Sequence, residues 1–155
     1  DIGTFTGMSS KVFLDYTNQD SIVHTFDIIG WQKFDSHLKK IDFTNGRIKQ
    51  HLSDLSKKKE FKKYLELISI SDLIFLDAPK DGCFEYRFLN LLSGAKLKQK
   101  NRLLIVDDIK FLNMLSLWRS INSPKIDATS FGHWSGTGIV DISNGLKLNK
   151  KYFYN

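Results

Sequence analysis

Two short apolar runs that each end on aspartate constrain the fold of this chain more than any other feature. The first is Leu73 to Leu76, followed by Asp77, and the second is Leu103 to Val106, followed by Asp107 and Asp108. Such runs, bounded by polar and turn residues, predict strands buried on both faces, as in parallel sheets covered by helices. Ligands of these sheets bind beyond the carboxyl ends of the strands, so we expect the three aspartates in a functional site.

Three carboxylates at one sheet edge would repel one another and have raised pKa values unless a cation neutralised them. Mg²⁺ suits this role because it takes a few carboxylates and completes its octahedron with water and substrate oxygens. The structural alternative is that each aspartate caps the next helix or forms a turn. On these residues alone both interpretations stay open, although the pair Asp107-Asp108 and Lys80, placed shortly after Asp77, favour a metal site.

The composition is typical of a folded protein with one domain, which we expect to span residues 1–155. Hydrophobic residues make up 41% of the 155 residues, and no apolar run approaches the roughly 18 residues that a membrane span needs. We find no signal-peptide pattern and therefore expect a cytoplasmic protein without membrane contact. Cys83 is the only cysteine, which excludes an intramolecular disulfide and argues against a cysteine-built zinc site.

The net charge of +6 permits an anionic partner. Most of the lysines lie in segments that read as exposed helix or tail, where a solvated face explains them. No interleaving of aromatic and basic residues marks a nucleic-acid groove, so we do not expect a nucleic-acid partner.

The first residues, Asp1-Ile2-Gly3, read as the end of a buried strand, and we expect a chain truncated at its N-terminus. Gly3 and Gly7 then permit a tight turn before a helix whose free N–H groups favour an anion. An ordinary strand-to-helix turn explains the same glycines. Asp27, near the end of the second strand, is placed to accept hydrogen bonds from ribose hydroxyls, as in doubly wound nucleotide-binding folds.

Strands and helices alternate along the rest of the chain. Period-2 and helical apolar patterns, with their turn residues, define the elements. The last two strands are joined by so short a connection that they must pair antiparallel. We expect helices at 8–16, 57–67, 83–92 and 111–121, strands at 22–29, 47–52, 73–76, 103–106, 125–130 and 137–142, and a polar C-terminal tail at 144–155.

This order resembles the class I S-adenosylmethionine-dependent methyltransferase fold. That fold is α/β, with a doubly wound, Rossmann-like, mostly parallel seven-stranded sheet and an antiparallel C-terminal β-hairpin. Residues 1–9 are similar to the E-x-G-x-x-x-G-x-S signature of the catechol-type, metal-dependent O-methyltransferases, with Asp1 in place of the common Glu. Asp77-x-x-Lys80 and Asp107-Asp108 resemble the metal-ligand motifs of the same family.

The resemblance implies S-adenosylmethionine as the cofactor. Asp27 would hold its ribose, and Asp77 would also lie at the cofactor. The family pattern assigns the methionine part to the glycine loop and its helix, and the adenine to the end of the third strand. The remaining cofactor-binding residues would thus be Gly3, Thr4, Phe5, Gly7, Ser9, Ser53 and Asp54.

The resemblance also implies that Asp77, Asp107 and Asp108 bind Mg²⁺ or a similar divalent cation. The metal would hold two vicinal oxygens of a small diol, catechol or sugar-like acceptor and lower the pKa of one. Lys80 would be the general base, with its pKa depressed by the metal; otherwise it is an exposed lysine near Asp81. The family pattern also allows a homodimer.

His133 and Trp134, in the loop between the last two strands, either reach the substrate or pack as a hairpin loop. Trp31 and Phe34 either cover an adenine ring or pack in the core. Besides an O-methyltransferase, two functions stay open. One is a degenerate methyltransferase-like domain that binds a nucleoside ligand or a protein partner without turnover. The other is a basic RNA-modifying methyltransferase, whose RNA binding would depend steeply on salt.

Overall fold

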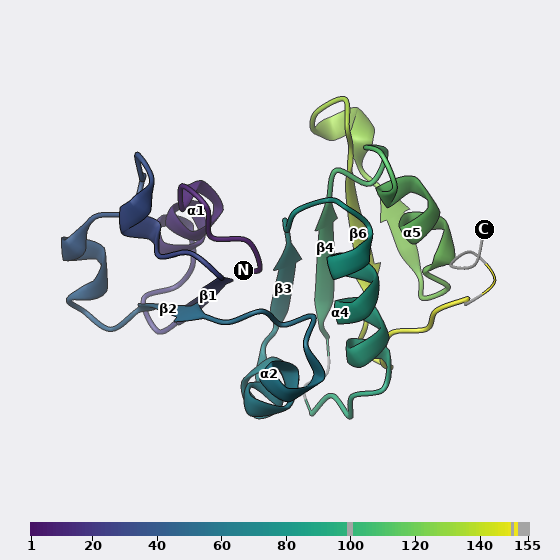
Figure 1. The fold of residues 1–155 in the computed structure, drawn as a ribbon, viewed down its shortest axis with the longest axis horizontal. Coiled ribbons are helices and arrows are strands. Elements are labelled where there is room, and N and C mark those ends of the chain that lie inside the picture. Colours follow the sequence, from purple (N-terminus) through teal and green to yellow (C-terminus); the bar gives the residue numbers. More distant parts are fainter. Residues whose placement is uncertain (99–100, 150, 152–155) are drawn as a thin grey trace. The chain divides into compact units, whose positions relative to one another are not determined.

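The computed structural model describes residues 1–98, 101–149 and 151 (Figure 1). Helices and strands alternate along the chain, so the predicted α/β class is confirmed. The chain divides into two compact units, residues 1–54 and residues 55–155.

The first unit contains a two-stranded parallel sheet. Val23 lies opposite Ile48 in its register, and Ile2 adds an isolated parallel bridge to Phe26. The core of this unit consists of the buried residues Leu14, Val23, Leu38 and Ile48. The elements are α1 (Met8–Tyr16), β1 (Val23–Asp27), the 3₁₀ helices η1 (Trp31–Lys33) and η2 (Lys40–Phe43), and β2 (Ile48–Leu52).

Strand β1 ends at Asp27, two residues earlier than the apolar pattern predicted. The Asp27 carboxylate accepts hydrogen bonds from the backbone N–H groups of Ile28 and Ile29, at 2.7 and 3.1 Å. This local turn takes both donors away from a strand ladder, as aspartate side chains commonly do. The end of β1 is thereby fixed at the residue that was predicted to bind a ribose.

The second unit contains a four-stranded sheet with the order β3-β4-β6-β5 (Figure 1). Strands β3 and β4 are parallel, and β6 is antiparallel to both β4 and β5, which confirms the predicted antiparallel pair. The elements are α2 (Lys58–Lys63), α3 (Leu65–Ile70), β3 (Leu73–Leu76), α4 (Cys83–Ser93), β4 (Leu103–Asp107), α5 (Met114–Ser120), β5 (Lys125–Asp127), the 3₁₀ helix η3 (Thr129–Phe131) and β6 (Thr137–Asp141).

The strands of this sheet alternate in burial, so the prediction of burial on both faces is wrong for them. Leu76, Leu104 and Val106 are completely buried, whereas Phe75 and Ile105 on the other face are only partly buried. Helix α5 packs on the buried face through Trp118, which lies so close to Gly138 of β6 that no Cβ atom fits there. A continuous apolar sequence therefore forms a sheet with one buried face and one partly exposed face.

Three predicted elements are shorter or interrupted. The helix expected at 57–67 breaks at Tyr64, which has φ −104° and ψ 9° and separates α2 from α3. Helix α5 begins at Met114 and not at residue 111, because Leu112 has a positive φ of 45°. Strand β5 ends at Asp127, whose carboxylate accepts the N–H of Thr129 at 3.0 Å.

Part of the predicted C-terminal tail, residues 144–155, packs on the second unit. Leu146 is buried, and Leu148 forms an antiparallel bridge to Ile121. The N–H of Asn149 donates to the carbonyl of Ser120 at 2.7 Å. Residues 150 and 152–155 of this segment lie outside the described residues.

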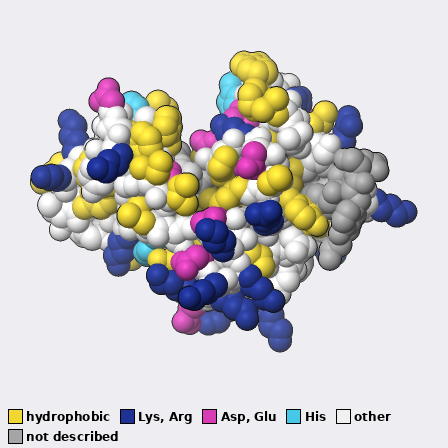
Figure 2. All heavy atoms as spheres, in the orientation of Figure 1, with side chains coloured by type: hydrophobic (Ala, Val, Ile, Leu, Met, Phe, Trp, Pro, Cys, Tyr) yellow, Lys and Arg dark blue, Asp and Glu magenta, His cyan; other side chains and the backbone are white. Residues whose placement is uncertain are grey.

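Lysine side chains gather over α2 (Figure 2), which carries Lys58, Lys59, Lys62 and Lys63 on a solvated helix. Among the described residues, no helix combines the length and the apolar character required to cross a membrane.

Candidate functional site

Asp77, Asp107 and Asp108 stand at the carboxyl ends of β3 and β4, which are parallel neighbours. The predicted edge of the sheet is therefore the place where these carboxylates gather. Asp108 has a positive φ of 56°, and so does Lys80, at 64°. Left-handed backbone at residues other than glycine is uncommon and tends to cluster at functional sites.

Lys80 joins the three carboxylates. Its Nζ lies 2.9 Å from Asp77 Oδ1 and 3.8 Å from Asp107 Oδ2, and it forms an ion pair with Asp108 Oδ2. Burial alone would lower the pKa of Lys80, but the hydrogen bonds to Asp108 and Asp77 outweigh burial and raise it. Lys80 is therefore an ammonium ion in this arrangement, and it relieves the repulsion that the sequence predicted among the aspartates.

The two carboxylates that contact Lys80 most closely differ in their pKa shifts. Burial raises the pKa of Asp77, and its hydrogen bond to Lys80 only partly offsets this effect. Burial also acts on Asp108, but hydrogen bonds with Lys80 and Ser135 outweigh it and lower the pKa. Asp108 is thus the better stabilised anion of the pair.

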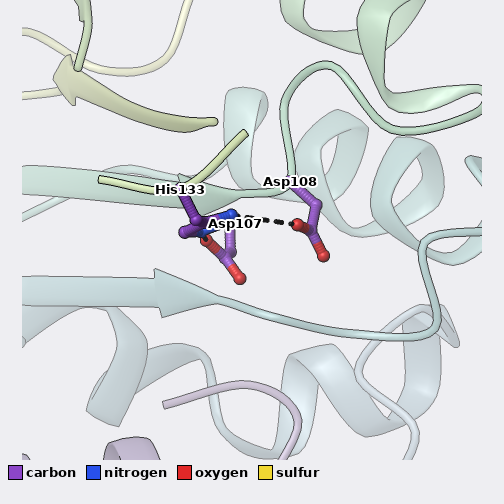
Figure 3. Close-up of side chains that lie close together, drawn as sticks. All are labelled: Asp107, Asp108 and His133. Carbon is purple, nitrogen blue, oxygen red and sulfur yellow. Dashed lines mark hydrogen bonds and ion pairs between the residues drawn. The ribbon is translucent and has the colours of Figure 1, made fainter. Parts of the chain in front are cut away.

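His133 enters the site from the loop between β5 and β6. Its Nε2 lies 2.9 Å from Asp107 Oδ1, and its Nδ1 lies 3.7 Å from Asp108 Oδ1 (Figure 3). Ser135 orients the ring through a hydrogen bond of 2.7 Å between its Oγ and Nδ1. Thr137 donates a hydrogen bond of 3.2 Å to Asp107 Oδ1. Of the two roles left open for His133, the structure therefore favours the site over simple packing.

Exposed aromatic side chains lie on the same loop. Trp134 is 78% exposed and packs edge to face on Phe111, with 6.0 Å between the ring centroids. Phe131 is 93% exposed. Hydrophobic atoms gather beside a histidine at this end of the second unit in Figure 2. Packing in a hairpin loop, one of the two interpretations left open for Trp134, does not account for these exposed rings.

Glu85 positions Lys80, and sequence reasoning missed it. This residue is completely buried in the first turn of α4, and its carboxylate accepts the N–H groups of Lys80 at 2.7 Å and Gly82 at 3.0 Å. Burial raises the pKa of Glu85. The spacing Gly82-x-x-Glu85 resembles a helix capping box, and this was the signal in the sequence that could have revealed it.

In the first unit, the predicted cofactor loop folds around the end of β1. The N–H groups of Gly3 and Thr4 both donate to the carbonyl of Phe26, at 2.9 and 3.2 Å. The buried Thr4 hydroxyl is hydrogen-bonded to the hydroxyl of Thr25 at 2.7 Å. Phe5 has a positive φ of 41° and a 60% exposed side chain.

Asp27 closes this loop through its side chain. Its Oδ2 accepts the N–H of Phe5 at 2.8 Å, while its Oδ1 accepts the two donors that end β1. A carboxylate has about four lone-pair sites, so three are used and one remains for a ligand. The structure thus brings Asp27 to the glycine loop, as expected, and gives it a structural role as well.

Gly7 has a structural reason for being glycine. Its φ of 76° is left-handed, and a Cβ atom here would lie 2.5 Å from the Cγ and Cδ1 atoms of Leu38. Gly7 is also the N-cap of α1, and no side chain caps that helix. The N–H groups of the first turn of α1 thus have no side-chain cap, as an anion site requires.

The remaining predicted cofactor residues differ in their surroundings. The Ser9 hydroxyl donates to Asp1 Oδ2 at 2.9 Å, and Asp1 Oδ1 is buried without a hydrogen-bond partner among the described residues. Ser53 is buried, and its N–H donates to the carbonyl of Asp27 at 2.8 Å. Asp54 ends the first unit.

The Trp31 ring stacks on the Phe43 ring, with 5.3 Å between the ring centroids. This contact favours the packing interpretation for Trp31 over a contact with adenine.

Among the described residues, one group of side chains is arranged so that three could share a metal ion. Asp107, Asp108 and His133 each offer a ligand atom, and these atoms lie within 4.8 Å of one another. Asp77, predicted as a ligand, lies outside this group and contacts Lys80. Carboxylate and imidazole donors suit a divalent cation, so the residues fit a metal with His133 in the ligand set.

Comparison with known proteins gave no relationship for this chain: no protein-family model matches it, and no curated protein is significantly similar to it.

Proposed function

We propose that this chain is an S-adenosylmethionine-dependent O-methyltransferase domain built on a doubly wound, seven-stranded sheet. The acceptor is a small molecule with vicinal oxygens, such as a diol, a catechol or a sugar. One observation carries the proposal: Asp77, Lys80, Asp107 and Asp108 converge at the carboxyl ends of two parallel strands. Two of these residues, Lys80 and Asp108, also have left-handed backbone, which is uncommon outside glycine and tends to cluster at functional sites.

The first unit supports the cofactor part of the proposal. S-adenosylmethionine supplies an electrophilic methyl group on a sulfonium centre. The glycine loop and the first turn of α1, without a side-chain cap, suit the methionine carboxylate. Asp27 retains one lone-pair site for a ribose hydroxyl, and Asp1 Oδ1 is a buried acceptor that an ammonium group would satisfy.

The second unit supports the acceptor part. A divalent cation bound to the carboxylates would hold two acceptor oxygens and lower the pKa of one of them. Hydrogen bonds to Asp108 and Asp77 raise the pKa of Lys80. In this arrangement its ammonium group neutralises part of the carboxylate charge and would orient an acceptor oxygen. Lys80 serves as a general base only if the positive charge of a nearby metal lowers this pKa.

A second candidate function is ligand binding without turnover by a degenerate domain of the same fold. The observation that favours it is that both key polar groups already have partners within the chain. Asp27 accepts three backbone N–H groups, and Lys80 contacts three carboxylates. Neither group then needs a substrate to satisfy it.

Calorimetric titration of S-adenosylmethionine, with and without MgCl₂, tests the proposal on the wild-type protein and on Asp107→Ala. The matched control is Asp127→Ala, which removes a more exposed carboxylate from the same unit. The proposal requires cofactor binding in all three proteins and a magnesium effect that only Asp107→Ala lacks. Product formation is then measured as S-adenosylhomocysteine release with catechol, diol and sugar acceptors.

Two results would decide against the leading proposal. Cofactor binding without any turnover across the acceptor panel would favour the degenerate domain. Absence of cofactor binding in the wild-type protein would exclude the methyltransferase for this chain.

A further inference from the structure

The carboxylates of Asp107 and Asp108 are shared between two groups on opposite sides. Their Oδ2 atoms face the ammonium of Lys80, at 3.8 Å for Asp107 and in a closer ion pair for Asp108. Their Oδ1 atoms face the imidazole of His133, at 2.9 Å for Asp107 and 3.7 Å for Asp108. A cation bound among the Oδ1 atoms and the imidazole would therefore not need to displace Lys80.

We propose that His133 is a direct ligand of a divalent metal, through Nε2, together with Asp107 and Asp108, while Asp77 remains the partner of Lys80. This inference rests on the proposed function only in assuming that the site takes a metal. It replaces the ligand set expected from the sequence, in which Asp77 was the third ligand. The three side chains point toward one another in Figure 3, and their ligand atoms lie within 4.8 Å of one another.

The two ring nitrogens of His133 have different partners. Nδ1 is hydrogen-bonded to the Ser135 hydroxyl at 2.7 Å, and Ser135 also contacts the carboxylate of Asp108. Nε2 lies 2.9 Å from Asp107 Oδ1. When Nδ1–H donates to Ser135, the lone pair of Nε2 can bind a metal ion.

Thr137 lies beside the same two atoms. Its hydroxyl is 3.2 Å from Asp107 Oδ1 and 3.4 Å from His133 Nε2. The hydrogen bond between Nδ1 and Ser135 is the support that metal-binding histidines commonly have at their other nitrogen.

The net charge of the site also favours a bound divalent cation. Asp77, Asp107 and Asp108 face a single cationic lysine, Lys80. These four side chains together retain two negative charges, which one divalent cation balances. Because the half-buried site screens charge less than water does, that balance favours a divalent over a monovalent cation.

An imidazole ligand changes which metal the site prefers. Mg²⁺ favours an all-oxygen set, whereas Co²⁺, Zn²⁺ and Fe²⁺ bind imidazole nitrogen well. We therefore expect Co²⁺ to bind more tightly than Mg²⁺, with Mn²⁺ between them. The absorption spectrum of bound Co²⁺ depends on its geometry and ligand set, so a change in His133→Gln reports the loss of the imidazole ligand without any measurement of enzyme activity.

The experiment titrates CoCl₂, MnCl₂ and MgCl₂ into the full chain without a polyhistidine tag, followed by calorimetry and Co²⁺ absorption. The variants are His133→Gln, Ser135→Ala and Asp77→Asn, and His37→Gln is the matched control because His37 is an exposed histidine of the other unit. Circular dichroism verifies that each variant is folded. S-adenosylmethionine binding is measured separately on each protein.

The proposal requires His133→Gln to weaken Co²⁺ binding by at least the roughly 10–100-fold that even supporting hydrogen-bond partners of a metal ligand contribute. Ser135→Ala should weaken it less, and His37→Gln should retain it. Asp77→Asn removes a neighbouring charge but no ligand, so it should weaken Co²⁺ binding less than His133→Gln does. The Co²⁺ spectrum should change in His133→Gln alone among the histidine variants. Loss of Co²⁺ binding in His133→Gln combined with no cofactor binding would support the metal site and contradict the methyltransferase.

Wild-type affinity for Co²⁺ in His133→Gln, or loss of binding in Asp77→Asn, would overturn the inference in favour of the sequence-predicted ligands and leave the proposed function standing. Absence of binding of all three metals to the wild-type protein would also overturn it, because Asp107, Asp108 and His133 would then hold no divalent cation. The separate measurement of S-adenosylmethionine binding would still test the proposed function.

Discussion

The carboxylate of Glu85 accepts the backbone N–H of Lys80 at 2.7 Å, from a side chain that is completely buried. A second hydrogen bond, from Gly82 at 3.0 Å, uses the other oxygen. Glu85 thus fixes the left-handed turn that presents Lys80 to the three aspartates. The charged centre of the candidate site depends on a residue that does not itself contact Asp107 or Asp108.

Glu85→Ala should destabilise the second unit, because it leaves two partly buried backbone donors, of Lys80 and Gly82, without an acceptor. An unpaired donor costs up to about 1–3 kcal/mol when it is fully buried, so we expect a smaller loss for each of these. Urea denaturation at neutral pH measures the loss. Glu66→Ala is the control, since Glu66 pairs with Lys98 on the surface and its side chain is 80% exposed. Equal stability of the two variants would contradict the anchoring role of Glu85.

Glu85→Gln should remove a pH dependence from the unfolding free energy. Burial raises the pKa of Glu85 above its ordinary value of 4.5, so the folded state binds more protons than the unfolded state just above that pH. This contribution to stability is complete below pH 4.5 and is lost as pH rises through the folded-state pKa. Urea denaturation at a series of pH values should give a flatter profile for Glu85→Gln over this window. An unchanged profile would show that Glu85 is not the titrating group.

Gly7→Ala should destabilise the first unit through two effects that a matched variant separates. Gly7 and Gly46 both have left-handed φ, of 76° and 72°. A Cβ at Gly7 would overlap Leu38 at 2.5 Å, whereas nothing lies within 4 Å of a Cβ at Gly46. We expect about 1–2 kcal/mol for the backbone effect in both variants and a further 1–3 kcal/mol of overpacking in Gly7→Ala. Thermal and urea unfolding measure the two losses, and equal losses would exclude the contact with Leu38.

Lys80→Gln should raise the affinity of the site for divalent cations, because it removes the positive charge that now balances part of the carboxylate cluster. Removing one unit charge a few ångströms from a metal ion is worth more than about 1.4 kcal/mol, so we expect at least a tenfold gain. Titration of MnCl₂ measures it. Lys98→Gln is the control, because Lys98 is 62% exposed and pairs with Glu66. Weaker metal binding in Lys80→Gln would mean that the lysine helps to assemble the metal site.

The sequence by itself determined two neighbouring strands of the second unit, β3 and β4. Strand β3 has the predicted bounds, and β4 differs from its prediction by one residue. These runs are read correctly because apolar residues between polar and turn residues specify a buried strand without reference to the rest of the chain. Asp77, Asp107 and Asp108 follow as strand-end residues, and their convergence follows from the parallel pairing of β3 and β4.

Only the tertiary structure decided which groups meet these carboxylates. Asp107 and His133 are 26 positions apart, and they meet because β6 lies between β4 and β5 in the sheet. The pairing partner of β6 is a non-local choice that no short pattern encodes. In the same way, Asp27 was predicted to face a ligand, but its side chain is drawn to the N–H groups of Phe5, Ile28 and Ile29, because backbone donors near a strand end need acceptors.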